Sequence, residues 1–373
     1  MATTKKTSKP AKKVDDENMN ALQYTPNYCS LVEIPARVFA PEVGLHRAEM
    51  IIITQKKWVN GTKLKYYFFN GGNDGSPASW KGDLAQKNVV KQAFNTWKSL
   101  GIGLEFEETN DKNDAQIRIG FMRGNGAWSY VGRDLIDIAS SPDERTMNFG
   151  WDISNDPDTA IHEIGHTLSA PHEHQNPNAG IVWNEEAVYT ALAQPPNSWN
   201  REKTFHNIIR KLPLNEVEGS THDPNSVMHY PFGVGLILAP AEFRNGIHPA
   251  GGLSAKDKEF VKKFYPPILS SEYIEMKVSN SQPMDIKSGQ QKNFVFKPTR
   301  SKKYKIETFG TMDTVMVLFE KSSTEEIYLA GDDDSGTETN SKIHMRLIKG
   351  RTYVIRVRLY YAEDEGVGSV MVI

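Results

Sequence analysis

The sequence has one cysteine in 373 residues, Cys29, so no intrachain disulfide can form. It also lacks any apolar run near the ~20 residues that a membrane-spanning helix needs. Neither sign of charge dominates, because 44 Lys and Arg oppose 46 Asp and Glu, which gives a formal net charge of -2. We therefore expect no membrane span and no bound nucleic acid, and a fold that its hydrophobic core must stabilise.

The N-terminus lacks the pattern of a secretory signal. Its first 13 residues are rich in Lys, Ser and Thr, and no apolar stretch follows them. The protein is then intracellular, or leaves by a route that reads no such signal, or has had its leader replaced. With their charge runs and prolines, residues 1–47 are predicted to be a leader or prosegment that is partly disordered.

The rest of the chain divides by its hydrophobic periodicity. Residues 48–267 mix strand-like runs with helical patterns, which predicts an α+β domain, whereas residues 268–373 show only short strands split by Gly, Ser and Asp, as in an all-β sandwich. The predicted strands are 50–54, 64–69, 104–107 and 115–120, and the predicted helices are 87–100, 158–168, 185–193 and 254–264. Ser254 and Asp257 form an approximate capping box at the start of the last helix.

Three histidines and a glutamate form the pattern His-Glu-x-x-His with a third histidine six residues later: His162, Glu163, His166 and His172. Residues four apart lie on one face of a helix, so His162 and His166 can direct their imidazoles at one point. Glu163 lies one position round, where it can touch a metal-bound water without ligating the metal. Three protein ligands leave the fourth position of a tetrahedral zinc open, and water there has a pKa of about 7. The pattern predicts a catalytic zinc site.

The helix has to end before His172 if the third histidine is to reach the same ion. Continued helically, a residue six beyond His166 would point away from the other two histidines. Pro171 cannot continue a helix and biases Ala170 toward extended geometry. We therefore expect the helix to break between Ser169 and Pro171, so that the chain turns back toward the metal.

A second pattern lies in Ser-Val-Met-His-Tyr at residues 226–230. With the histidines, it resembles the metzincin metallopeptidases, and among them the astacin-like group. In that family a Met-containing turn runs beneath the three histidines, and a tyrosine two residues later can reach the zinc as an additional ligand. The resemblance implies that Met228 gives structural support and that Tyr230 is a catalytic residue and an additional ligand.

The resemblance covers residues 51–266 and implies a metzincin-like zincin domain, with a twisted mixed sheet and an active-site helix. Residues 58–62 are similar to the family's entry into this domain, residues 126–132 to the segment beside its substrate-binding edge strand, and residues 253–265 to its last helix. Trp128 and Tyr130 in the second segment can line a substrate groove or belong to the core.

Three features depart from the family or stay open. Ser169 replaces the glycine at the helix break, where a positive φ is wanted, at a cost of about 1 kcal/mol. The family's disulfides are absent. Glu173, after the third histidine, matches the astacin-like form, in which a newly cut N-terminus is buried beside it, and the sequence leaves its partner here open.

The implied reaction is hydrolysis of a peptide bond by a metal-activated water. Glu163 takes the proton from the water and returns it to the leaving amine, as general base and then acid. Tyr230 can donate its phenolic O–H to the developing oxyanion. The implied cofactor is one catalytic Zn²⁺.

The C-terminal region, residues 268–373, is similar to the β-sandwich modules of the pre-peptidase C-terminal type found in secreted bacterial peptidases. Its acidic loop contains Asp332, Asp333 and Asp334, whose carboxylates can bind Ca²⁺ or can simply be solvated.

Cys29 is open to two interpretations. A thiolate ahead of such a domain can occupy the open zinc position as a latency ligand, since soft sulfur suits zinc. It can equally be an incidental leader cysteine, because the flanking residues lack the usual latency motif.

The sequence therefore predicts a zinc metalloendopeptidase that acts on protein or peptide substrates as a monomer. The alternatives are a protein that binds a surface or carbohydrate through the β-sandwich, with the zincin fold as scaffold, and a secreted proteolytic effector or toxin. The resemblance implies secretion although no signal peptide is visible, so the localisation stays open.

Overall fold

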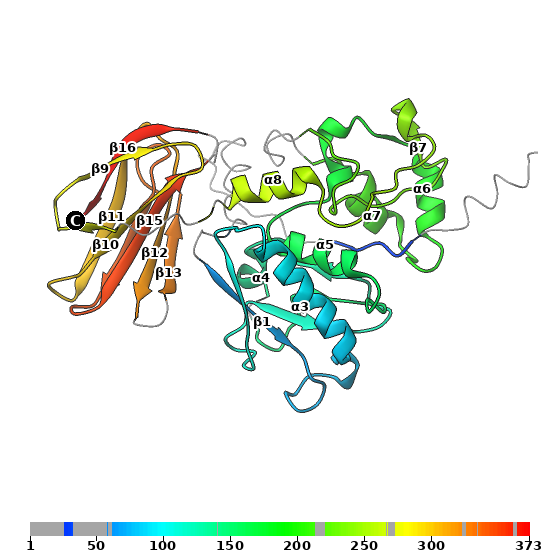
Figure 1. The fold of residues 1–373 in the computed structure, drawn as a ribbon, viewed down its shortest axis with the longest axis horizontal. Helices are drawn as coiled ribbons and strands as arrows, with labels where there is room; N and C mark the ends of the chain where they lie inside the picture. Colours follow the sequence, from blue (N-terminus) through cyan, green and yellow to red (C-terminus); the bar gives the residue numbers. More distant parts are fainter. Residues whose placement is uncertain are drawn as a thin grey trace, which may run out of the picture. The chain divides into compact units, whose positions relative to one another are not determined.

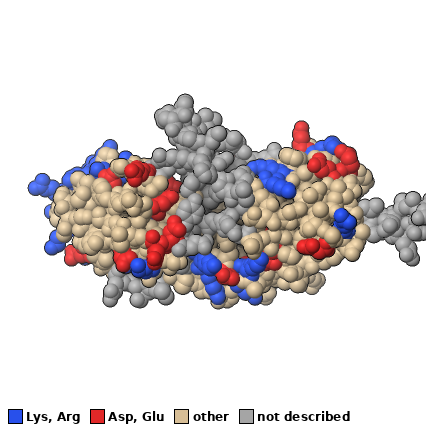
Figure 2. Space-filling model, turned by 90° about the horizontal axis from the view of Figure 1, so that it is seen from above, with Lys and Arg blue, Asp and Glu red and all other residues tan. Residues whose placement is uncertain are grey.

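The computed structural model describes residues 26–32, 58, 62–139, 141–212, 221–265, 267, 273–322, 326–333, 335–360 and 364–373. The strand predicted at 50–54, the domain boundary at 47/48 and residue 268 lie outside these ranges. The chain forms two units, residues 1–29 with 172–250 and residues 30–171 with 251–373. Among the described helices, none is long and apolar enough to cross a membrane. Basic and acidic side chains are interspersed on the face drawn in Figure 2.

A five-stranded sheet organises the first part of the unit that contains residues 30–171 (Figure 1). Its strands, in the order β2-β1-β3-β5-β4, are β1 (Lys63–Phe68), β2 (Glu105–Glu108), β3 (Ile117–Gly120), β4 (Trp128–Ser129) and β5 (Met147–Asn148). All the pairs are parallel except β4 with β5, so the sheet is mixed, with β4 as an edge strand. The predicted mixed sheet is confirmed.

Helices accompany this sheet in the same unit: α3 (Leu84–Lys98), α4 (Asp134–Asp137), α5 (Pro157–Thr167), α8 (Ala255–Phe264) and the short 3-10 helix η1 (Ala78–Trp80). The Asp83 side chain caps the start of α3. The apolar face of α3 packs on the sheet, where the ring of Phe94 stacks on that of Tyr66 with 4.3 Å between the centroids. The capping box predicted for Ser254 and Asp257 is present at the start of α8.

Short elements make up residues 172–250. They are the 3-10 helices η2 (Glu173–Gln175), η3 (Pro177–Ala179) and η6 (Ala241–Phe243), the helices α6 (Glu185–Leu192) and α7 (Arg201–Thr204), the π-helix η4 (Phe205–Ile209), and the strands β6 (Val182–Trp183) and β7 (Ile237–Ala239). β6 and β7 pair antiparallel. Buried aromatic rings hold this unit together; Trp183, for example, meets Phe232 edge to face at 4.7 Å.

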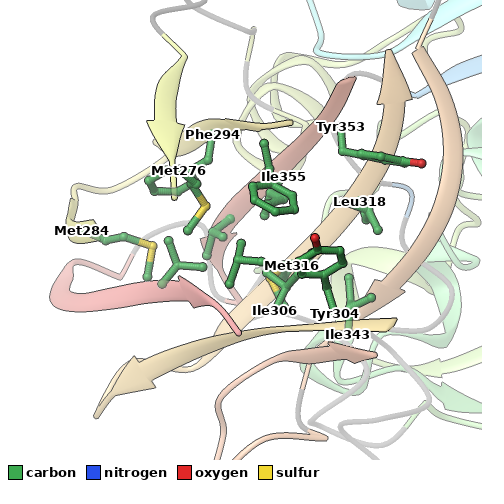
Figure 3. Close-up of a cluster of buried hydrophobic side chains, with 14 of the residues drawn as sticks. Met276, Met284, Phe294, Tyr304, Ile306, Met316, Leu318, Ile343, Tyr353 and Ile355 are labelled. Atoms are coloured by element: carbon green, nitrogen blue, oxygen red, sulfur yellow. The ribbon is translucent and has the colours of Figure 1, made fainter. Parts of the chain in front are cut away.

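The C-terminal region is a β-sandwich, as predicted. One sheet has the order β13-β12-β15-β10-β8 and the other the order β14-β11-β16-β9 (Figure 1). The strands are β8 (Ile274–Met276), β9 (Gln282–Ile286), β10 (Gln291–Phe296), β11 (Lys302–Gly310), β12 (Thr314–Lys321), β13 (Glu326–Asp332), β14 (Lys342–Leu347), β15 (Thr352–Leu359) and β16 (Gly366–Val372). Alternate residues of each strand face inward, so Ile355 of β15, Leu318 of β12 and Ile306 of β11 meet in one core (Figure 3).

Candidate metal centre

The helix α5, which carries the first two histidines, begins at a well-formed cap. Asp156 accepts hydrogen bonds from the backbone N–H and the hydroxyl of Thr159. Pro157 follows at the first helical position, where its missing N–H leaves no donor unsatisfied. The sequence around Asp156 therefore fixes where the helix starts and which face His162 occupies.

Two tryptophans tie α5 to its neighbours within the same unit. The indole N–H of Trp97, on α3, donates to the carbonyl of Ile161 at 3.0 Å. The indole N–H of Trp58 donates to the carbonyl of Thr167 at 2.7 Å. Each bond joins a large buried ring to the backbone of the helix, so these contacts fix both the position and the rotation of α5.

The helix ends where the sequence predicts. Ser169 has φ 70°, and the backbone N–H groups of Ser169 and Ala170 donate to the carbonyls of His166 and Gly165. These two bonds form a Schellman motif, whose left-handed position glycine usually fills. The Ser169 hydroxyl lies 3.3 Å from that of Tyr265, so serine holds this conformation with help from a neighbour.

His162 and His166 lie one turn apart on α5, with ring centroids 4.7 Å apart and ring planes at 89°. The Nδ1 atom of His166 is 2.8 Å from the carbonyl oxygen of Ala170. A proton on Nδ1 satisfies that carbonyl and leaves Nε2 as a lone-pair donor. Burial, and then the nearby His162, holds the pKa of His166 well below its ordinary value, so its imidazole is neutral, as a metal ligand must be.

His172 lies close to Tyr230 and Cys29. The Cys29 Sγ is 3.2 Å from His172 Nε2. The Tyr230 hydroxyl is 2.6 Å from the same nitrogen, and it donates to the carbonyl oxygen of Cys29 at 2.6 Å. His172 and Tyr230 are both buried, with 0% and 4% of their surfaces exposed. The leader thus reaches the third histidine.

The ligating atoms of Cys29, His162, His166 and His172 all lie within 4.8 Å of one another, and all four residues are buried. Three imidazoles and a thiol are the donor set that zinc favours, so these residues fit the ion that the sequence implies. The three predicted histidines are therefore brought together, and Cys29 joins them. Glu163, beside His162 on α5, is fully buried.

The turn that carries the predicted methionine contacts the segment of the third histidine. The backbone N–H of Glu173 donates to the carbonyl of Met228 at 3.0 Å. The Glu173 carboxylate accepts from the side chain of Asn176 and from the backbone N–H of Asp223. The turn that contains Met228 thus contacts the residue that follows His172. The sequence left the partner of Glu173 open, and in the structure Asn176 and Asp223 donate hydrogen bonds to its carboxylate.

The sequence also offered two aromatic residues as candidates for a substrate groove and an acidic loop as a candidate calcium site. Trp128 and Tyr130 are half-buried and meet edge to face at 6.1 Å. In the acidic loop, Asp332 accepts hydrogen bonds from Ser335 and from the backbone N–H of Lys342, so local donors use its carboxylate. Asp334 lies outside the described residues, and within the described ranges the histidine and cysteine group is the only cluster that could hold a metal. Calcium binding is not supported.

Three residues outside the predicted ligand set also contact this site. His174 is 2% exposed and stacks on His172 and Tyr230, with ring centroids 5.2 and 4.5 Å apart. Asn197 and Trp199 contact the leader just before Cys29. No local motif marks Asn197 or Trp199, because their partners in the leader lie at least 169 residues away in the sequence.

Known proteins are similar to this chain in sequence and in fold. The sequence profile of the peptidase family described as Astacin matches residues 54–233. A solved structure of myroilysin superposes with a TM-score of 0.50 at 30% identity, covering 58% of this chain and 98% of that chain. The chain belongs to the astacin family. The predicted resemblance to astacin-like metallopeptidases, a family of zinc-dependent hydrolases, is therefore confirmed.

Two curated astacin relatives are similar over the same region. Zinc metalloproteinase nas-36 from Haemonchus contortus is 26% identical over 57% of this chain and 31% of its own length. Tolloid-like protein 1 from Mus musculus is 28% identical over 57% of this chain and 19% of its own length. The chain thus spans less than a third of either relative, and the likeness concerns the astacin-like part of each protein.

Proposed function

We propose that this astacin-family protein is a zinc-dependent endopeptidase, with residues 48–267 as its catalytic domain and residues 268–373 as a separate β-sandwich domain. One observation carries the proposal: three buried histidines, which the family pattern picks out, have ligating atoms within 4.8 Å of one another. When bound, zinc polarises a carbonyl and lowers the pKa of a coordinated water.

In this proposal each residue of the pattern has its own task. His162, His166 and His172 hold the metal, and the bond from His166 Nδ1 to Ala170 keeps one of these rings in the ligating tautomer. Glu163 takes a proton from the attacking water and returns it to the leaving amine. Its position supports this role, because Glu163 is fully buried next to His162 on α5.

Tyr230 is proposed to stabilise the oxyanion of the transition state. Its hydroxyl donates to the carbonyl oxygen of Cys29, a residue whose thiol lies beside His172. A substrate carbonyl that replaces Cys29 would meet the same donor. A hydrogen bond that strengthens as charge develops on that oxygen lowers the barrier rather than merely tightening binding.

Cys29 is proposed to be the latency ligand. The interpretation as an incidental cysteine becomes less favourable, since the thiol belongs to the histidine cluster. A thiolate there competes with water for the open position on zinc. The full-length protein is then inactive until the leader leaves the site.

A chelator-sensitive digest tests the proposed activity. Protein whose leader has been removed by limited digestion with an added protease, followed by purification, should hydrolyse casein, lose that activity with chelator, and regain it when zinc is restored. Glu163→Ala should retain its zinc and lose casein hydrolysis by at least about a hundredfold. Casein hydrolysis that persists in metal-free protein would refute the proposal. Absence of hydrolysis, with tight binding of a polysaccharide by the β-sandwich, would favour the binding-protein alternative.

A further inference from the structure

A short stretch of the leader is held in place by residues far from it in sequence. The Asn197 side chain donates from Nδ2 to the carbonyl of Pro26 at 2.8 Å. Its Oδ1 accepts the backbone N–H of Tyr28 at 3.0 Å. One amide side chain thus offers a donor and an acceptor to a neighbouring backbone, as an adjacent β-strand would. This clamp recognises the main chain of residues 26–28 regardless of their side chains.

The side chain between the clamp and the metal centre enters an aromatic pocket. Tyr28 is only 3% exposed, and its ring lies against those of Tyr230, Phe232 and Trp199, with centroid distances of 4.9, 5.8 and 6.3 Å. Beyond the ring, the Tyr28 hydroxyl donates to the carbonyl of Pro231 at 2.7 Å.

The pocket adjoins the metal centre. Tyr230 forms one wall of the pocket through its ring, while its hydroxyl donates to the carbonyl of Cys29. The residue after Tyr28 is Cys29, and its Sγ atom lies 3.2 Å from His172 Nε2. A chain bound in this way therefore presents one side chain to the pocket and the adjacent residue to the metal ligands.

We propose that this pocket recognises a tyrosine side chain of the protein substrate beside the bond to be cleaved, and that Asn197 holds the substrate backbone there. In the structure, Tyr28 of the leader occupies this pocket in place of the substrate tyrosine. A residue that served only to pack the leader would need neither a main-chain clamp nor a polar acceptor at the end of an aromatic pocket. The acceptor favours tyrosine over phenylalanine, because only the tyrosine hydroxyl can donate to the Pro231 carbonyl.

The biological meaning of this pocket rests on the proposed endopeptidase function, but its binding can be measured without hydrolysis. The probe is the hexapeptide acetyl-Pro-Asn-Tyr-Ala-Ser-Leu-amide, in which alanine replaces the cysteine so that no thiol binds metal. It is titrated calorimetrically into the full-length Tyr28→Ala variant in the presence of chelator. The tyrosine peptide should bind, with phenylalanine at its third position about tenfold weaker and alanine about a hundredfold weaker.

Asn197→Ala, combined with Tyr28→Ala, provides the matched control. It should weaken the tyrosine and phenylalanine peptides by the same factor, about tenfold, and leave their ratio unchanged, since the clamp contacts only main chain. Equal affinity for all three peptides, or no binding by a folded Tyr28→Ala protein, would overturn the proposal.

A second measurement covers the case in which Tyr28→Ala does not fold. Peptides that the active unsubstituted protein releases from denatured protein mixtures are sequenced by mass spectrometry. Tyrosine should be enriched about tenfold at one fixed position near the cleaved bond, and a flat distribution there would contradict the pocket. Selective peptide binding without any hydrolysis would instead reject the endopeptidase and keep the pocket.

Discussion

The two sides of the histidine cluster are built in different ways. His162 and His166 lie on one helix, and the hydrogen-bond partner of His166, the Ala170 carbonyl, is four residues away. On the other side, Cys29 meets His172 across 143 residues and Tyr230 across 201. Local structure thus fixes the first pair of ligands, whereas only long-range contacts fix the leader. If the proposed latency holds, we expect the first side to stay in place and the second to be released on activation.

We expect the largest loss of zinc and of activity from substitution of a histidine on α5. His166→Ala removes one of the three proposed histidine ligands, so we expect the purified protein to lose its zinc and at least about a thousandfold of its activity. Metal content by mass spectrometry checks this. The control, His344→Ala, changes an exposed histidine of β14 and should keep a full equivalent of zinc. Equal zinc in both variants would mean that α5 does not supply the ligands.

Removing the Cys29 thiol should raise the activity, whereas removing a histidine should lower it. Cys29→Ser weakens the interaction of the leader with zinc, so the initial rate of casein hydrolysis by full-length protein should rise about tenfold or more. Ser30→Ala, one residue further on, is the control and should leave that rate unchanged within about twofold. If Cys29→Ser starts no faster than the unsubstituted chain, the thiol does not keep the protein latent.

A smaller effect tests how rigidly α5 is held. Trp97→Phe removes the indole donor to the Ile161 carbonyl and leaves a gap in the core, which should lower the free energy of unfolding by about 1–3 kcal/mol. Urea titration followed by circular dichroism measures it. Trp128→Phe, at a half-buried position on the edge strand, should cost less than about 1 kcal/mol. Equal losses in the two variants would argue that Trp97 has no special role in anchoring the helix.

The smallest expected difference concerns the end of α5. Ser169→Gly and Ser169→Ala both delete the hydroxyl, but only glycine adopts φ near 70° without strain. The glycine variant should therefore be the more stable of the two by about 1 kcal/mol, measured as a shift in the urea midpoint. A more stable alanine variant would contradict the left-handed conformation assigned to this residue.

The same contrast explains what the sequence could predict. The spacing of His162 and His166 indicates a helix, and Pro171 indicates where it ends. Ser169 stands where related proteins have a glycine, which indicates a positive φ. The structure has all three features. These predictions succeed because each depends on residues within one or two turns. The capping box at Ser254 was predictable for the same reason.

The leader side was largely not predictable. The bond between Asn197 and Tyr28 spans 169 residues, and asparagine in a turn-rich segment is ordinary. The π-helix at Phe205–Ile209 and the burial of His174 likewise depend on packing that no local pattern encodes. Family resemblance supplied the role of Tyr230, but not the aromatic pocket that its ring helps to form.

Residues 26–29 contact the site through the Asn197 clamp, ring stacking and the Cys29 thiol, and a cut elsewhere in the leader would leave these contacts intact. While the peptide chain is intact, the segment rebinds at the high effective concentration of a tethered group. After a cut separates it, the clamp, the ring stacking and the thiol contact remain available, but the fragment competes only at its concentration in bulk solution. Activation would then depend on dilution, and a concentrated protein would remain inhibited by its own released peptide.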